Sequence, residues 1–299
     1  MNIAEAKLFA KEQLSSSPSP ALDGEVLLSF ITGLNKTQLL FEREKLLTEK
    51  QETQFTDAVQ KRKTGLPVAY ITGHKEFFGY DFFVTPDVLI PKPDTEILVQ
   101  KTIDLIEEKT KVKELISLCD MCTGSGCVAV SAVKAAFEKK ILTDKNELLV
   151  VLADISESAL NIARRNAENL CPGITFRFVR TNLFENIHGS FDIICTNPPY
   201  VPHDESVELL KDGRSEPLLA LDGDVNLNGE STGENDGLGI IRNLIPEAVL
   251  HLNPHGKLLM ETGEYNAEEA ERLFIKHGLK ETEIVRDLEG QLRVVNGHI

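Results

Sequence analysis

The feature that most constrains the fold is a regular alternation of short apolar runs and amphipathic helical segments, which begins near residue 114 and continues to the end of the chain. Such alternation is typical of an α/β fold with a doubly wound, mostly parallel sheet and helices on both faces. Two strand-like runs follow one another at the end, so one edge of this seven-stranded, Rossmann-like sheet should be antiparallel. The expected strands are 114–120, 148–154, 175–179, 191–196, 256–261, 281–286 and 292–296; the expected helices are 127–137, one capped by Ser156, 240–252 and 267–277.

The first ~65 residues show helical spacing without a strand pattern. Helices are expected at 22–31, after a Ser/Pro-rich turn, and at 48–63. Aromatic residues on both sides of a Gly-Tyr-Asp turn predict a β-hairpin over 77–84. A proline-stiffened segment, 88–96, then leads into a helix that Asp94 or Thr95 would cap. We therefore expect a small helical domain at 1–75, a β-hairpin linker at 76–90 and the α/β domain at 91–299.

Composition limits the compartment and the partners. No apolar run approaches the ~20 residues that a transmembrane helix needs. Residues 1–20 contain no arginine and show no targeting pattern, so we expect a cytoplasmic protein with no membrane partner. The net charge of −15 disfavours direct nucleic-acid binding, which depends on Lys and Arg, and favours a protein substrate. The five cysteines include one Cys-x-x-Cys, Cys119 and Cys122, but no second ligand pair follows, so we expect reduced thiols and no metal site.

The first chemical signal is the turn Asp120-Met-Cys-Thr-Gly-Ser-Gly126, between an expected strand and an expected helix. Its glycines allow a sharp turn and let a ligand lie against bare backbone. The turn lacks the third glycine of the dinucleotide fingerprint. The Asp120 carboxylate suits a cationic amino group and would repel a pyrophosphate. Taken alone, the glycine pattern is also compatible with simple turn chemistry.

A second acid, Asp154, closes the next strand. An acid at the end of the second strand of such a sheet is placed to accept both hydroxyls of a ribose. The alternative is a helix-entry residue next to Ser156. Its position after the glycine turn favours ribose binding.

The most specific signal is Asn197-Pro198-Pro199-Tyr200, directly after the apolar run 191–196. Two prolines hold the backbone extended and rigid. The Asn197 side-chain oxygen and the Pro198 carbonyl are then placed to accept both hydrogens of a planar NH2 group, and Tyr200 is placed to stack on the substrate. A loop or a WW-domain ligand would be the alternative, but such ligands lie in disordered tails and not at the end of a strand.

These three signals resemble class I S-adenosylmethionine methyltransferases that act on amide or amine nitrogens. The whole chain is similar to the HemK/PrmC family, the release-factor glutamine N5-methyltransferases. The similarity extends over 22–28, 65–73, 77–79, 216–221 and 287–295, and it is most specific at 88–96, where the family usually has Leu-Ile-Pro-Arg-Pro-Asp-Thr-Glu. Ribosomal-protein methyltransferases of the same group usually lose the Pro-Asp-Thr-Glu ending, which favours the release-factor branch.

The resemblance implies transfer of a methyl group from S-adenosylmethionine to the glutamine N5 of the Gly-Gly-Gln motif in peptide release factors, by a monomer whose helical domain recognises the substrate. Catalysis and substrate binding would involve Asn197, Pro198, Pro199 and Tyr200. The cofactor-binding residues would be Asp120, Cys122, Thr123, Gly124, Ser125, Gly126, Asp154, Ile155, Asn182, Leu183 and Asn197.

Three positions depart from the family pattern. Lys92 replaces an arginine, which keeps the charge but loses the planar fork. Cys122 replaces the first glycine of the turn, so we expect no positive φ there. Leu183 stands where tryptophan often lies beside the adenine, and we expect the leucine to pack on the ring.

The segment 222–237 is longer than usual for the family. Asp224, Asn226, Asn228 and Gly229 imitate the start of a calcium loop, but its twelfth position is Asn235 and not glutamate. We expect a mobile, solvated surface loop.

Two other classes of function remain open: a methyltransferase with another substrate, and a non-catalytic binding protein. The same tetrapeptide serves enzymes that methylate exocyclic amines of nucleic acids, and a ribosomal-protein glutamine is a further substrate of the same chemistry. A non-catalytic binding protein on this fold is the alternative of another class, although it would have no need of an intact Asn-Pro-Pro-Tyr.

Overall fold

A computed structural model describes residues 1–213, 215–225 and 230–299 and divides them into two compact units. The smaller unit comprises Met1–His74 and Leu209–Ser215, and the larger comprises Lys75–Glu208 and Glu216–Ile299. No sequence pattern indicated that residues 209–215 would group with the N-terminal helices. In the described part of the chain, no helix combines the length and apolar character needed to span a bilayer.

The smaller unit consists of short helices around one apolar core. Three capping boxes, at Asn2, Asn35 and Thr48, fix the starts of α1, α3 and α4. Phe55 is fully buried in the core, and Arg62 pairs with the largely buried Asp23 at 2.7 Å. The helices expected at 22–31 and 48–63 are confirmed. The elements are α1 (Ile3–Gln13), α2 (Pro20–Thr32), α3 (Lys36–Phe41), α4 (Glu49–Lys63), α5 (Val68–Thr72) and the 3₁₀ turn η3 (Leu210–Asp212).

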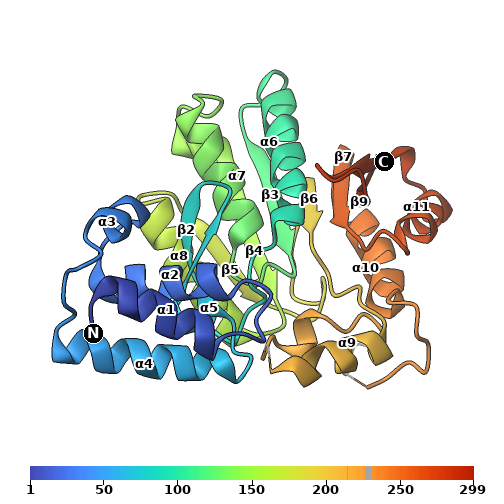
Figure 1. The fold of residues 1–299 in the computed structure, drawn as a ribbon. Coiled ribbons are helices and arrows are strands. Elements are labelled where there is room, and N and C mark those ends of the chain that lie inside the picture. The colour runs from blue at the N-terminus through green and yellow to red at the C-terminus, as the bar shows by residue number, and fades with distance from the viewer. Residues whose placement is uncertain (214, 226–229) are drawn as a thin grey trace. The chain divides into compact units, whose positions relative to one another are not determined.

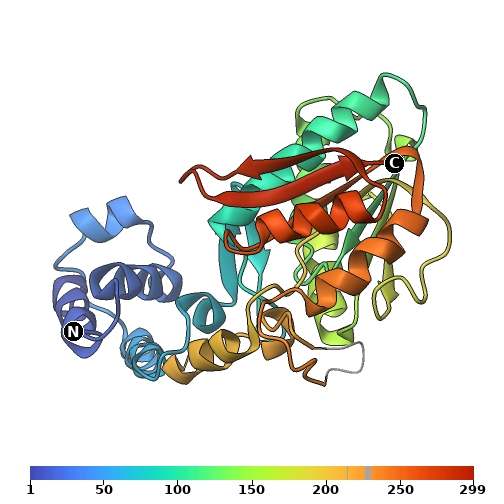
Figure 2. The same cartoon turned by 90° about the vertical axis from the view of Figure 1, so that its right-hand side faces the viewer.

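The larger unit is built on a seven-stranded sheet, as its sequence pattern predicts. The strand order is β5-β4-β3-β6-β7-β9-β8. Neighbouring strands from β5 to β7 are parallel, and β9 is antiparallel to both β7 and β8. Figure 2 shows the resulting β8–β9 edge hairpin in dark red. The strands are β3 (Ile116–Met121), β4 (Leu148–Asp154), β5 (Phe176–Arg180), β6 (Phe191–Thr196), β7 (Leu252–Glu261), β8 (Lys280–Arg286) and β9 (Leu292–His298).

Helices cover both faces of this sheet, so it is doubly wound (Figure 1). On one face the apolar sides of α6, α7 and α8 form the larger core, and on the other α10 and α11 form a second core. Each helix buries one apolar stripe against the strands. The helices of this unit are α6 (Glu96–Thr110), α7 (Cys127–Glu138), α8 (Glu157–Leu170), α9 (His203–Leu209, whose last residue belongs to the smaller unit), α10 (Gly239–Leu250) and α11 (Ala267–Lys276), with 3₁₀ turns η1 (Pro93–Thr95), η2 (Lys145–Glu147) and η4 (Leu218–Ala220).

The boundary between α10 and β7 differs most from the sequence-based expectation. The helix expected to reach residue 252 ends at Leu250, and the strand expected from 256 begins at Leu252. Leu252 pairs with Phe191, and a bulge follows before Lys257 pairs with Ile193. The bulge absorbs Pro254 and Gly256, which read as strand breakers in the sequence. The hairpin is confirmed as β1 (His74–Phe77) and β2 (Tyr80–Phe83).

The strand register determines where the chemistry lies. Asp120 is level with Leu152 of β4 and Cys195 of β6, and Thr196 is level with Met260 of β7. The carboxyl ends of the parallel strands therefore meet at one edge of the sheet. In open α/β sheets this edge is where ligands bind.

Candidate active site

A pocket in the larger unit opens at this edge of the sheet. It contains most of the residues expected to bind the cofactor: Asp120, Cys122, Thr123, Gly124, Ser125, Asp154, Ile155, Asn182 and Leu183. Asn197 and Pro199 also line it, whereas Gly126, Pro198 and Tyr200 do not. The structure thus brings the three sequence signals together around one cavity.

Asp120 lies almost fully buried at the end of β3. Its Oδ2 accepts hydrogen bonds from the Thr123 hydroxyl at 2.7 Å and from the Ala129 backbone N–H at 3.2 Å. Burial raises the pKa of Asp120 to about 7, because an ionised carboxylate loses its hydration there. A cation at this position would favour the ionised form, as expected for a ligand with an amino group.

The glycine turn after Asp120 is open toward the pocket. Gly124 has φ +55°, and a side chain added there would meet no atom within 4 Å. Gly126 has φ +79°, and a Cβ added at this residue would lie 3.3 Å from side-chain atoms of Ala163 and Leu152. The first glycine therefore leaves room for a ligand, and the second allows helix α7 to pack closely.

The expectation for Cys122 is wrong. This residue has φ +59°, in the left-handed region, although it is not a glycine. The chain must turn at this point so that the Thr123 N–H reaches the Ala153 carbonyl on the neighbouring strand, at 3.0 Å. Cys122 therefore adopts a left-handed backbone conformation that is strained for a residue with a side chain. Strained backbone of this kind is typical of ligand sites.

Asp154 closes β4 and bridges two turns. Its Oδ2 accepts from the Gly124 backbone N–H at 2.8 Å, and its Oδ1 accepts from the Ser156 N–H at 2.9 Å. Ser156 caps α8 as expected, through a hydrogen bond from the Ala159 N–H to its hydroxyl. A carboxylate has about four lone-pair positions, so Asp154 keeps spare acceptor capacity beyond its contacts with the backbone.

Leu183 lies at the side of the pocket with φ +46°, and it is buried. Such a conformation is unusual for a residue with a branched side chain. Leu183 and Ile155 are two of the apolar residues that line the pocket. An apolar wall at this point suits a flat ring.

Asn197 follows β6 and reaches the pocket. Its Nδ2 donates to the hydroxyl of Thr95 at 3.2 Å. Tyr200 does not line the pocket. Its hydroxyl donates to Glu261 Oε1 at 3.0 Å, and its ring packs against the second core. The tyrosine carbonyl accepts from the side chains of Asn266 and Tyr265, at 3.1 and 3.2 Å.

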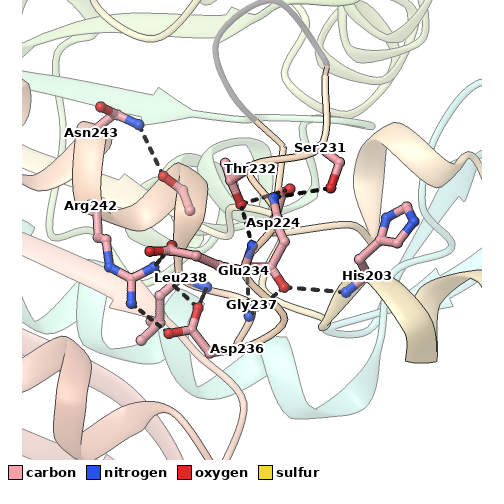
Figure 3. A network of polar contacts seen from close by, with 12 residues as sticks. His203, Asp224, Ser231, Thr232, Glu234, Asp236, Gly237, Leu238, Arg242 and Asn243 are labelled. Atoms are coloured by element: carbon pink, nitrogen blue, oxygen red, sulfur yellow. Dashed lines mark hydrogen bonds and ion pairs between the residues drawn. The ribbon is translucent and has the colours of Figure 1, made fainter.

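The segment 222–237 is not a fully solvated loop, which corrects the expectation. Asp222, Gly223 and Asp224 are buried, whereas 230–235 are exposed. The Asp224 carboxylate accepts from the backbone N–H groups of His203 at 3.2 Å and Gly237 at 2.9 Å (Figure 3). These contacts hold both ends of the segment against the chain that follows Tyr200. Asn226, Asn228 and Gly229 lie outside the described residues, and the residues described show no group of three or more side chains placed to hold a metal ion.

The Pro-Asp-Thr-Glu segment makes several contacts that its sequence pattern does not predict. Thr95 occupies the N-cap position of α6, but its side chain does not cap the helix and instead accepts from Asn197. Asp94 pairs with Arg293 at 3.4 Å, and Glu96 accepts from the Phe78 N–H at 2.9 Å. Lys92 pairs with the buried Glu216 at 2.6 Å. The resemblance marked this segment as specific, but only the fold shows that it lies against Asn197.

The fold is that of class I methyltransferases. The hMettl16 catalytic domain, in complex with MAT2A 3′UTR hairpin 6, is similar with a TM-score of 0.53 and 14% identity, over 86% of this chain and 84% of that one. A Thermus thermophilus 16S rRNA N2 G1207 methyltransferase in complex with AdoMet and guanosine is similar with a TM-score of 0.50 and 14% identity, over 75% of this chain and 49% of that one.

Sequence comparison identifies the family. The model of the PrmC N-terminal domain matches residues 5–73, and that of the methyltransferase small domain matches 99–212. Release factor glutamine methyltransferases of Salmonella typhimurium and Koribacter versatilis are 33% and 35% identical, over 96% and 95% of this chain and 95% and 93% of those proteins. That of Buchnera aphidicola is 34% identical over 99% of this chain and 98% of its own length. The chain belongs to the release factor glutamine methyltransferase family.

Proposed function

We propose that this protein transfers a methyl group from S-adenosylmethionine to the side-chain amide nitrogen (N5) of the glutamine in the Gly-Gly-Gln motif of peptide release factors. The names of the full-length relatives support the substrate. The single observation that supports the chemistry most strongly is the position of Asn197. Its amide lies on a rigid Pro-Pro segment at the pocket that Asp120 and Asp154 also line.

The residues of the pocket fit S-adenosylmethionine. Asp120 offers a buried carboxylate to the cationic amino group, and Asp154 offers a carboxylate with spare acceptor capacity to the two ribose hydroxyls. Gly124 leaves open space between them, and Leu183 with Ile155 provides an apolar wall for the adenine. When bound, the cofactor supplies a methyl group on a positively charged sulfur, which is already activated for transfer.

The protein then has to orient a poor nucleophile. The lone pair of an amide nitrogen is shared with its carbonyl, so the nitrogen must be held with its face toward the methyl group. In our proposal the Asn197 side-chain oxygen and the Pro198 carbonyl accept hydrogen bonds from the two N–H groups of the substrate amide. These acceptors favour the positive charge that develops on nitrogen during attack, and fixed geometry supplies much of the acceleration. The extra proton leaves to solvent after transfer.

The partner in this proposal is a protein. The net charge of −15 opposes direct nucleic-acid binding and favours a release factor with a basic surface. The helical domain 1–75 would recognise the release factor, and 91–299 would bind the cofactor and perform catalysis. We infer that the enzyme acts as a monomer in the cytoplasm, where translation termination takes place.

The test is mass spectrometry of a purified release factor after incubation with this protein and S-adenosylmethionine. One added methyl group on the Gly-Gly-Gln glutamine is expected, and a release factor with alanine at that position should receive none. Methylation of a ribosomal protein or a nucleic acid instead would keep the chemistry and overturn the substrate. Transfer to none of them would favour a non-catalytic binding protein.

A further inference from the structure

A buried asparagine outside the pocket contacts the backbone of the glycine turn. Asn166 lies in α8 with an exposed fraction of 1%, and it does not line the pocket. Asparagine is a poor helix former, and a buried amide without partners is costly. An apolar side chain would suit the interior of a packed helix better. The hydrogen bonds of the Asn166 amide are therefore the feature that an apolar residue could not supply.

The Asn166 side chain binds two segments that lie far apart in the sequence. Its Nδ2 donates to the Ser125 carbonyl at 2.9 Å, in the glycine turn. The same NH2 group donates to the Phe83 carbonyl at 3.0 Å, and its Oδ1 accepts from the Phe83 N–H at 2.8 Å. Both hydrogens of the amide and its oxygen are therefore bound to backbone groups.

The hydrogen bond to Ser125 acts on a turn that is flexible by composition. Ser125 lies between Gly124 and Gly126, which both have positive φ, and glycines let a peptide group rotate at little steric cost. The Gly126 N–H donates to the Thr123 carbonyl at 2.8 Å. The C=O and N–H of a trans peptide point in opposite directions. Asn166 and Thr123 thus hold the peptide between Ser125 and Gly126 from opposite sides.

The hydrogen bonds to Phe83 hold the chain that leads into a second wall of the pocket. Phe83 is the last residue of β2, which lies beside α8 (Figure 1). The Arg165 guanidinium covers the Phe83 ring, at 3.4 Å from its centroid. The chain that follows contributes to the pocket lining Asp87, Val88, Leu89, Pro91 and Lys92. A single amide therefore joins the glycine turn to the start of this second wall.

We propose that Asn166 is a positioning residue that fixes the peptide between Ser125 and Gly126 for S-adenosylmethionine and joins this turn to the backbone of Phe83. Binding of the cofactor against the turn then also stabilises the end of the hairpin. The inference rests on the proposed function, which supplies the identity of the cofactor. A residue that only anchored the hairpin would hold Phe83 equally well with and without the ligand.

Two substitutions separate the roles of the amide. Asn166→Asp keeps an acceptor for the Phe83 N–H but has no NH2 to donate to the Ser125 carbonyl, and Asn166→Leu loses both contacts at about the same size. Each variant leaves the buried Ser125 carbonyl without this partner. The Kd for S-adenosylmethionine, measured by calorimetry at pH 8 and well below the Tm of each variant, should increase by about tenfold in both.

Hydrogen exchange shows whether the turn and the hairpin are coupled. In the wild type, S-adenosylmethionine at about 100 times its Kd should slow exchange of the Phe83 amide by about tenfold or more, although Phe83 does not line the pocket. In Asn166→Asp the same amide keeps its acceptor, but the ligand should slow its exchange by less than about twofold. Without ligand, the Gly126 amide should exchange about tenfold faster in both variants than in the wild type, because its peptide is then held from one side only.

Asp192→Asn is the matched control. Asp192 is a buried carboxylate near the start of β6, at the other end of the strand from Asn197, where it accepts from the Ser117 N–H at 2.9 Å and from Lys113. This variant also weakens buried hydrogen bonds, so it should lower the Tm. It should leave the Kd for the cofactor and the ligand-dependent exchange of Phe83 unchanged.

The outcomes separate this inference from the proposed function. A Kd within about twofold of wild type in both Asn166 variants, or wild-type exchange of Phe83 that does not respond to the cofactor, would overturn the inference. Cofactor binding with the expected exchange pattern, but without methyl transfer to a release factor, would refute the proposed function and support the positioning role. If the wild type binds no S-adenosylmethionine, the proposed function fails, and the Gly126 amide decides the inference: faster exchange in the variants would support the positioning of the turn, and wild-type exchange would overturn it.

Discussion

Gly237→Ala should damage the active site from outside the pocket. Gly237 has φ +72°, and a Cβ at this residue would lie 2.0 Å from the Tyr200 carbonyl oxygen and 2.8 Å from its carbon. Contact between such atoms requires more than 3 Å, so the two segments must separate by about 1 Å. Tyr200 ends the Asn-Pro-Pro-Tyr segment, and the displacement would therefore reach the residues that orient the substrate.

The expected magnitude has two parts. The left-handed conformation costs a non-glycine residue about 1–2 kcal/mol, and the overlap adds about 1–3 kcal/mol. The thermal midpoint of a domain this large falls by about 2–4 °C for each kcal/mol, so Tm should decrease by about 4–20 °C. A misplacement of about 1 Å in a reacting group costs about 100-fold in rate. We expect kcat to fall by about that factor when measured well below the new Tm.

Gly233→Ala is the matched control in the same segment. Gly233 has φ +77°, but an added Cβ would meet no atom within 4 Å. It should show only the conformational cost of about 1–2 kcal/mol and a wild-type kcat. The assay is methyl transfer to the release factor, with circular dichroism for Tm. Equal kcat in the two variants would refute the argument that Gly237 holds the catalytic segment in place.

Two further predictions concern pH. Burial raises the pKa of Asp120 to about 7, so the carboxylate takes up a proton below pH 7, and the Kd for S-adenosylmethionine should then increase by up to about tenfold per pH unit. The Asp120→Asn variant should bind the cofactor weakly at all pH values. A wild-type Kd that does not change with pH in titration calorimetry would contradict this. The pKa values of Asp120 and Glu261 are both raised above those of the unfolded chain. Between about pH 4 and pH 7 the folded protein therefore binds more protons than the unfolded chain. The contribution of these two groups to the free energy of unfolding falls as the pH rises through that window. S-adenosylmethionine should therefore raise Tm more at pH 8 than at pH 5.5, and an equal increase in thermal-shift measurements would count against ionised Asp120 as its ligand.

Much of the fold follows from local sequence pattern. The run 191–196 matches β6 and the run 148–154 matches β4, because mostly apolar strands between turn residues leave little choice of boundary. The end of α10 and the start of β7 were misplaced, because the pairing of Leu252 with Phe191 is a long-range contact that periodicity does not contain. The buried ends of the 222–237 segment were missed for the same reason. Its composition is polar, but Asp224 accepts from backbone groups far away in sequence.

Sequence pattern predicts pocket-lining residues best where the residue type and its place at the end of a strand both indicate the same role. Asp120, Asp154 and Asn197 line one pocket because each lies at or next to the end of a strand, and the carboxyl ends of parallel strands meet. Cys122 was misjudged because the absence of glycine suggested an ordinary φ, whereas the turn imposes a positive one. Thr95 was not assigned to the site because its contact with Asn197 joins two segments that lie far apart in the sequence.

In the proposed mechanism Asn197 holds the nucleophile, while Asp120 and Asp154 hold the cofactor. Asn197→Ala tests this division most directly, with methyl transfer to the release factor and affinity for S-adenosylmethionine measured on the same preparation. Loss of an oriented hydrogen-bond acceptor at the reacting group should lower kcat by about 100- to 1,000-fold, while the Kd for the cofactor stays close to wild type. A parallel loss of turnover and of cofactor affinity would contradict the account.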